Sequence, residues 1–261
     1  MFRWDLVWHF LFADPNQLFL HAAWTTLWIS VVAQLLGVIF GLFLALMRMS
    51  RHSWLTWPAQ AYIWFFRGSP LLVQVLLLFD GLPRVIINNH NLLLPNWACV
   101  LVAFSLNEGA YMAEIIRAGI TSVDTGQMEA AKSLGMRYAL AMRRVILPQA
   151  ARVIIPPLGN EFNNMLKTTS IASVIGLLEL TGTAEVYGSQ DFIIFELLIV
   201  ATVYYLLLTT LWGYFQSWIE NRLDPDRTLK TELVDKKSWG NRVLGFGSSK
   251  PGDAGTLVSG R

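Results

Sequence analysis

The sequence predicts an all-α integral membrane protein with five transmembrane helices. Of its 261 residues, 54% are hydrophobic and only 15% are charged, whereas soluble domains carry about 25% charged residues. Several apolar segments match the roughly 20 helical residues that cross a hydrocarbon core about 30 Å thick. Lys and Arg also gather in alternate segments between these spans, which is typical of loops on the cytoplasmic side.

The first two spans are predicted over residues 22–46 and 58–79. The first span contains no charged residue and lies too far from the start of the chain for a cleaved signal peptide. The second span contains Gly68 and Pro70, which should break or kink its helix. Pro58 suits the first turn of this second span, where the missing N–H needs no partner.

The last three spans are predicted over residues 97–116, 153–178 and 192–219. The first of these carries Glu108 and Glu114. The last is almost entirely apolar. The span between them is unusually polar, because it contains Asn160, Glu161, Asn163, Asn164 and Lys167.

The positively charged residues predict how these spans are oriented. With the N-terminus outside, the inner segments are 47–57, 117–152 and 222–261, which hold 2, 6 and 8 Lys and Arg residues. Only Arg3 and Arg84 then lie outside. Since positive residues favour the cytoplasmic side, we expect the N-terminus outside and the C-terminus in the cytoplasm.

This orientation divides the chain into three regions. Residues 1–21 form an extracytoplasmic N-terminal segment, and residues 22–219 form a transmembrane domain with a cytoplasmic loop at about 118–150. Residues 220–261 form a cytoplasmic tail that is charged and then rich in Gly and Ser. Because the tail has no apolar periodicity, we expect it to be largely disordered.

Several functional classes lack support in the sequence. A single cysteine, Cys99, excludes an intrachain disulfide and a cysteine metal cluster, and the four histidines show no zinc-binding spacing. A net charge of +2 provides no basic field for nucleic acid. Neither a GxxxxGK[ST] phosphate-binding loop nor a catalytic HExxH or GxSxG motif is present. We therefore expect no metal, no cofactor and no enzymatic activity on this chain.

The long cytoplasmic loop is predicted to be structured. Asp124 precedes Gln127 by three residues, as in a capping box, and Gly135 is placed to end the helix that begins there. A second short helix fits residues 137–147, with Pro148 as its stop. Two such helices can dock into a partner's groove or lie on lipid headgroups, and periodicity alone leaves both interpretations open.

A motif of fixed spacing in this loop resembles the EAA loop of ATP-binding-cassette (ABC) importer permeases. The family pattern is EAA-x3-G-x9-I-x-LP, and Val145 stands here where Ile is usual. The match extends over 20 residues. Its members, which the resemblance implies are contacts for an ATPase rather than catalytic residues, are Glu129, Ala130, Ala131, Gly135, Leu147 and Pro148.

Three further segments resemble the polar amino-acid branch of these permeases, the histidine/glutamine/arginine type. They are RGSPLLVQ at 67–74, NEGAYMAEIIR at 107–117 and KTTSIASVIG at 167–176. Together the similarity covers residues 20–220. It implies the type I importer permease fold and a bacterial cytoplasmic (inner) membrane protein, surrounded by lipid.

The resemblance implies a permease subunit that imports polar amino acids. Its implied partners are cytoplasmic ATPase subunits that bind ATP and Mg, an extracytoplasmic amino-acid-binding protein, and a second permease chain that is another copy or a paralogue. For Gly135, a plain helix cap is the alternative to an ATPase contact, and one glycine can serve both roles.

The polar stripe in the fourth span predicts a substrate path. Asn160, Asn163, Asn164 and Lys167 share one helical face, and their donors and acceptors suit a zwitterion. Hydrogen bonding between helices is the alternative. Glu108 is a further candidate, for contact with a substrate cation, for pairing with Lys167, or as a protonated acid; Tyr111, one turn away, can line the same path.

Other polar residues of the spans are predicted to be structural. Glu114 and Arg117 stand at i,i+3 and suit a neutralising pair. Arg67 lies beside the kink at Gly68 and Pro70.

An ion-gradient-driven transporter that uses Glu108, Glu161 and Lys167 is the alternative function. Five spans without visible repeats argue against it, and dependence on a separate ATPase discriminates the two.

Overall fold

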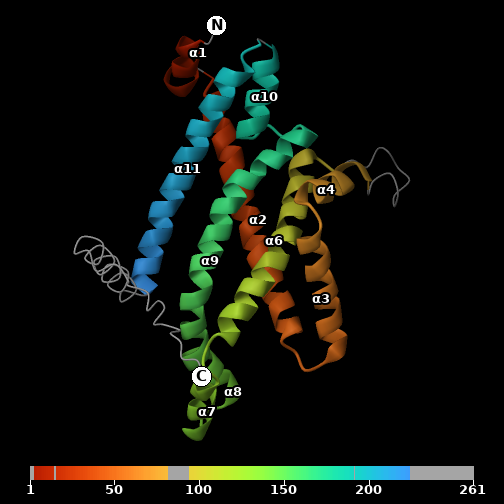
Figure 1. Cartoon of the computed structure of the whole chain (residues 1–261), viewed down its shortest axis with the longest axis vertical. Coiled ribbons are helices and arrows are strands. Elements are labelled where there is room, and N and C mark those ends of the chain that lie inside the picture. Colours follow the sequence, from red (N-terminus) through yellow and green to blue (C-terminus); the bar gives the residue numbers. More distant parts are fainter. Residues whose placement is uncertain (1–2, 15, 82–93, 191, 224–261) are drawn as a thin grey trace, which may run out of the picture. The chain divides into compact units, whose positions relative to one another are not determined.

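The computed structural model describes residues 3–14, 16–81, 94–190 and 192–223, and every element within these ranges is helical. The tail predicted to be largely disordered is 220–261: residues 220–223 belong to the last helix, and residues 224–261 lie outside the described residues. Figure 1 shows the arrangement of the helices. Five long or paired helices are α2 (Leu18–Arg48), α3 with α4 (Ser53–Gly68 and Leu71–Leu76), α6 (Asn96–Thr121), α9 (Leu147–Thr168) and α11 (Ile194–Leu223).

Short elements connect these helices. A π-helical turn follows α1, another extends α4, a third joins α8 to α9, and a 3-10 segment follows α9. These short elements are α1 (Trp4–Trp8) with His9–Ala13, Leu77–Gly81, α7 (Thr125–Ser133), α8 (Tyr138–Ala141) with Met142–Ile146, Thr169–Ile175, and α10 (Leu180–Gln190).

Helices α2 and α6 run side by side at the centre of the fold (Figure 1). Their approach depends on glycine, because a Cβ at Gly41 of α2 would lie 2.9 Å from the Ala113 nitrogen and 3.0 Å from the Gly109 oxygen. A buried cluster that includes Ile29 and Phe104 fills the space where these two helices meet α4 and α9. Helices α2 and α6 thus form the packed core against which α4 and α9 lie.

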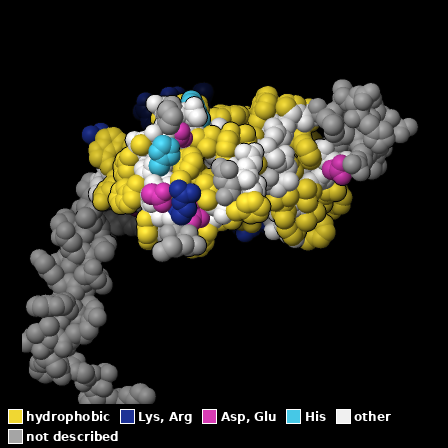
Figure 2. Space-filling view, turned by 90° about the horizontal axis from the view of Figure 1, so that it is seen from above, with side chains coloured by type: hydrophobic (Ala, Val, Ile, Leu, Met, Phe, Trp, Pro, Cys, Tyr) yellow, Lys and Arg dark blue, Asp and Glu magenta, His cyan; other side chains and the backbone are white. Residues whose placement is uncertain are grey.

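The described part of the chain contains three helices, α2, α6 and α11, that are long and apolar enough to cross a membrane. A bent pair, Ser53–Gly68 with Leu71–Gly81, raises the number to four if it forms one span. Helix α9 is not among them, since it carries Arg152, Glu161 and Lys167 besides three asparagines. Seen from one end, most of the described side chains are hydrophobic and few are charged (Figure 2).

The break predicted at Gly68 and Pro70 is confirmed, because the two halves of this segment are bent by 104°. The bend is stabilised by side chains. Pro70 has no N–H for the carbonyl of Phe66, four residues earlier. That carbonyl instead accepts hydrogen bonds from Gln74 Nε2 at 3.0 Å and from Asn107 Nδ2 at 2.9 Å.

Three predicted boundaries were wrong. Helix α3 begins at Ser53, so Pro58 lies inside the helix rather than in its first turn. Pro148 stops no helix: the π-helical turn before it continues into α9, and Pro148 occupies the first turn, where a proline is tolerated. The polar span predicted over 153–178 is helix α9 followed by a 3-10 segment, which ends at Gly176 with φ +75°.

Candidate functional site

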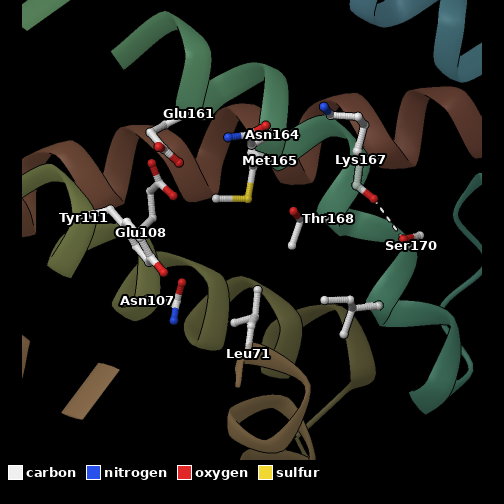
Figure 3. Close-up of a pocket in the computed structure, with 11 residues that line it drawn as sticks. Leu71, Asn107, Glu108, Tyr111, Glu161, Asn164, Met165, Lys167, Thr168 and Ser170 are labelled. Carbon is white, nitrogen blue, oxygen red and sulfur yellow. Dashed lines mark hydrogen bonds between the residues drawn. The ribbon is translucent and has the colours of Figure 1, made fainter. Parts of the chain in front are cut away.

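A polar cavity of about 510 Å³ lies between α6, α9 and the start of the following 3-10 segment. Leu71 of α4 closes one side. Figure 3 shows the lining side chains. They are Leu71, Asn107, Glu108, Tyr111, Glu161, Asn164, Met165, Lys167, Thr168, Ser170 and Ile171.

Glu108 is the most enclosed acidic residue of this cavity. Its exposed fraction is 4%, and its Oε1 atom has no hydrogen-bond partner. The absence of a side chain at Gly37 of α2 provides its space, because a Cβ there would lie 2.6 Å from the Glu108 Cγ. The carboxyl group of Glu161, on α9, is turned toward that of Glu108 (Figure 3).

Four of the six residues predicted for the substrate path line the cavity, namely Glu108, Tyr111, Asn164 and Lys167. Lys167 lies on the opposite side of the cavity from Glu108 (Figure 3), and the structure records no ion pair between them. The other two predicted residues, Asn160 and Asn163, do not line the cavity.

Asn160 and Asn163 lie outside the cavity because the face of α9 that lines it is offset from the predicted stripe. The lining residues Glu161, Asn164, Met165 and Thr168 recur at i, i+3, i+4 and i+7, which is one helical face. Asn160 lies outside this face, and its Oδ1 accepts a hydrogen bond from Gln216 Nε2 of α11 at 3.1 Å.

Sequence reasoning left several lining residues out of the site. Glu161 and Thr168 carried a detectable signal, since their spacing from Asn164 matches one face of a helix. Asn107 has a structural role as well, because its Nδ2 donates to the Gln74 Oε1 at 3.1 Å. Leu71 belongs to a distant segment, and nothing in the local pattern places it here.

A separate charged cluster surrounds Glu114 on α6. Arg117 donates to it from Nε at 3.2 Å and from Nη2 at 3.1 Å. Arg48 of α2 also donates to Glu114, and Arg67 Nη1 of α3 lies 3.8 Å from it. The Arg67 guanidinium stands 5.2 Å from the ring centroid of Tyr111. One carboxylate therefore ties together three helices.

The loop with the EAA motif begins with a capped helix, α7. Asp124 Oδ1 accepts a hydrogen bond from the Gly126 N–H at 2.7 Å. The predicted capping box is only half formed, because Gln127 Oε1 accepts from Gln149 Nε2 at 3.3 Å instead. Of the predicted contact residues, Ala131 is buried, and the exposed ones are Glu129, Ala130, Gly135, Leu147 and Pro148.

Gly135 ends α7 in a left-handed conformation with φ +79°. The N–H of Gly135 donates to the Lys132 carbonyl at 2.9 Å, and the Met136 N–H donates to the Ala131 carbonyl at 3.1 Å. This pair of bonds is the Schellman arrangement. Next to it, Leu134 has an exposed fraction of 83%, so the turn presents an uncovered apolar side chain.

Helices that are apolar enough to cross a membrane, a cavity lined by charged and polar side chains, and a structured loop are together typical of a membrane transport subunit. Residues 37–225 match the family described as "Binding-protein-dependent transport system inner membrane component". The chain belongs to this family. It is thus an inner-membrane ABC permease, and ATP hydrolysis takes place on a separate subunit rather than on this chain.

Individual relatives agree with this assignment. The chain is 40% identical to the arginine transport system permease protein ArgU of Corynebacterium glutamicum, over 87% of this chain and 74% of the relative. It is 40% identical to the octopine transport system permease protein OccM of Rhizobium meliloti, over 79% and 86%. It is 37% identical to the probable glutamine ABC transporter permease protein GlnM of Bacillus subtilis, over 81% and 95%.

Solved structures show the same fold. The crystal structure of an amino acid ABC transporter with histidines matches with a TM-score of 0.73 at 43% identity, and the match covers 79% of this chain and 94% of that one. The inward-facing MetNI methionine ABC transporter matches with a TM-score of 0.65 at 18% identity, over 81% and 99%. The fold is therefore that of type I ABC permeases, and nothing in it supports the ion-gradient-driven alternative.

Proposed function

We propose that this permease passes polar amino acids through the cavity between α6 and α9. The observation that carries the proposal is the mixture of groups that line one cavity: carboxylates, amides, hydroxyls and an ammonium. A zwitterion needs acceptors for its ammonium group and donors for its carboxylate. The volume of about 510 Å³ also lies within the range of small-molecule sites. The relatives named for arginine, octopine and glutamine transport support a cargo of this kind.

A bulky side chain in the cavity should block transport. Thr168 lies among the lining residues in Figure 3, so the change Thr168→Trp fills the space. We expect ATP-dependent uptake of radiolabelled amino acids by proteoliposomes that hold the whole transporter to fall at least tenfold. Leu211→Trp, at an α11 position with an exposed fraction of 60%, is the matched control. Equal uptake by the two variants would show that cargo does not use this cavity.

The proposed topology has five spans, with α9 as a span besides α2, the bent pair, α6 and α11. A polar helix is acceptable inside a bilayer when its polar residues face the bundle or a water-filled path, and α9 directs several toward the cavity. The excess of Lys and Arg in alternate segments supports an outer N-terminus and a cytoplasmic C-terminus. Residues 1–21 are then extracytoplasmic, and the loop at about 118–150 and the tail from residue 220 are cytoplasmic.

Cysteine labelling should report this orientation directly. In a Cys99→Ala background, an impermeant maleimide should label Phe12→Cys in intact spheroplasts. It should label Lys132→Cys only after the membrane is permeabilised. Both positions are exposed, so accessibility depends on the side of the membrane. The opposite labelling pattern would contradict the proposed orientation.

The loop with the EAA motif is the proposed contact for the ATPase. Glu129 and Gly135 are exposed there, and Leu134 and Tyr138 have exposed fractions of 83% and 61%. Apolar side chains exposed on a rigid helical turn suit a partner's groove. A second permease subunit, an extracytoplasmic amino-acid-binding protein and surrounding lipid complete the proposed assembly.

A further inference from the structure

We propose that the arginine cluster around Glu114 binds the phosphate groups of an anionic phospholipid. The pocket concerned has a volume of about 440 Å³ and lies between α2, α3 and α6. Of the described residues, it shares only Tyr111 with the cavity between α6 and α9. The inference goes beyond the proposed function, because it concerns the lipid around the protein and not the cargo. The residues that line the pocket are Arg48, Gln60, Ile63, Trp64, Arg67, Gly68, Tyr111 and Glu114.

The cluster holds more positive charge than its carboxylate can neutralise. Arg48, Arg67 and Arg117 surround Glu114, so three positive charges stand against one negative charge and two remain in surplus. Among the described residues, Glu114 is the only acidic side chain that lines the pocket. Positive charge among transmembrane helices is costly unless it is paired. The surplus therefore predicts an anion that comes from outside the chain.

Arg67 is the arginine that Glu114 satisfies least. Arg117 donates to Glu114 from two nitrogens, and Arg48 donates to the Glu114 Oε1. Arg67 Nη1 lies 3.8 Å from the same Oε1, which is too far for a hydrogen bond. The Arg67 side chain is 44% exposed and lines the pocket together with Arg48. Because both guanidinium groups approach one carboxylate oxygen, they are close enough to bind one phosphate, an anion that suits the guanidinium fork.

The position of the pocket favours a lipid headgroup over a dissolved anion. Arg48 is the last residue of α2, and Glu114 lies about two turns before the end of α6 at Thr121. The pocket is therefore near the ends of these helices, and the proposed orientation places those ends at the cytoplasmic side. Basic pockets between transmembrane helices on that side are typical binding sites for the headgroups of acidic phospholipids.

Helix α3 provides an apolar surface beside the arginines. Trp57 and Trp64 lie seven residues apart, on one face of the helix, and both are exposed, Trp64 with an exposed fraction of 77%. Trp64 also lines the pocket. Tryptophan is typical of the membrane interface, where its ring contacts apolar chains and its N–H contacts polar groups. A bound phospholipid thus has its phosphate against the arginines and its apolar part against the exposed face of α3.

The affinity of the whole transporter for single phospholipids tests this inference. We would measure the apparent Kd of cardiolipin and of phosphatidylcholine by native mass spectrometry of the delipidated transporter. Cardiolipin carries two phosphate groups and two negative charges, which match the surplus, whereas phosphatidylcholine is neutral overall. Wild type should bind cardiolipin about tenfold more tightly, which corresponds to about 1.4 kcal/mol. Equal affinity for the two lipids overturns the proposal.

Two variants and two matched controls locate the site. Arg67→Gln removes one guanidinium without removing a hydrogen bond of Glu114, and Gln60→Glu adds a negative charge at an exposed position of the pocket wall. Each variant, checked for assembly by size-exclusion chromatography, should bind cardiolipin no more tightly than phosphatidylcholine. Arg152→Gln on α9 and Gln190→Glu on α10 make the same charge changes at exposed positions outside the pocket, and they should bind like wild type. If either assembled pocket variant keeps the wild-type affinity for cardiolipin, the assignment of the lipid to this pocket is wrong.

Two competitors distinguish the sources of the anion. An excess of inorganic phosphate should not displace cardiolipin, because phosphate has no apolar chains to place against α3. L-Arginine should not displace cardiolipin either, because the proposed cargo occupies a different cavity. Complete displacement by phosphate would assign the pocket to a dissolved anion, and displacement by L-arginine would assign it to the route of the cargo; each result overturns the lipid site. The passage of amino acids between α6 and α9 is tested separately by Thr168→Trp.

Discussion

Gly135→Asn and Gly135→Asp should each abolish transport and the co-purification of the ATPase with a C-terminally tagged chain. Asparagine and aspartate are the residues that best tolerate the left-handed conformation found at Gly135. Apart from the residues next to it in the chain, no described residue places an atom within 4 Å of the position that their Cβ would occupy. Both substitutions therefore leave the helix end intact, and their effect reports a surface that comes from another subunit.

Gly176→Asn is the matched control for this experiment. Gly176 has φ +75° and open space around the Cβ position, and it closes the segment after α9 with the same pair of hydrogen bonds. Asparagine there should leave co-purification and uptake unchanged. If Gly135→Asn and Gly135→Asp also transport normally, Gly135 is only a helix cap and the proposed ATPase contact at this residue is wrong.

Gly41→Ala should destabilise the protein strongly for a single added methyl group. The new Cβ would lie 2.3 Å from the Met112 Cβ and within 3.0 Å of two backbone atoms of α6. A rotamer change cannot relieve contacts with backbone atoms, so α2 and α6 must separate. Overpacking of this kind costs about 1–3 kcal/mol. We expect a lower midpoint of thermal unfolding, measured in detergent by size-exclusion chromatography of a fluorescent fusion.

Gly213→Ala on α11 is the control for the effect of alanine in a helix. Nothing lies within 4 Å of its Cβ position, and alanine favours a helix over glycine by about 1 kcal/mol. Its unfolding temperature should therefore be unchanged or higher. If Gly41→Ala unfolds at the temperature of wild type, the close approach of α2 and α6 does not contribute to stability.

Features that depend on neighbouring residues were the predictable part of the fold. Long, mostly apolar runs predicted the positions of α2, α6 and α11, although each helix begins or ends a few residues away from the predicted limit. The break between α3 and α4 followed from Gly68 and Pro70, because a missing N–H acts within one helical turn.

Features that depend on distant contacts were not predictable in this way. The four polar residues of the predicted stripe in α9 do lie on one helical face, but which face meets α6 is decided by packing. Gln216 of α11 donates a hydrogen bond to Asn160, and Glu161, the next residue of α9, lines the cavity. The helix that continues through Pro148 was not predictable either. A π-helical turn before the proline lets the helix continue, and no local sequence pattern predicted that turn.

The passage of the chain through Pro148 without a break has a mechanical consequence. Helical structure is continuous from Tyr138 to Thr168, so the last residues of the EAA motif, Leu147 and Pro148, and the cavity wall with Glu161 belong to one helical stretch. At about 1.5 Å per residue, such a rod transmits a push over tens of ångströms. We therefore expect a displacement of residues 138–147 to tilt the cavity wall with them. A flexible hinge inserted after Pro148 should let the loop move while the cavity wall stays in place.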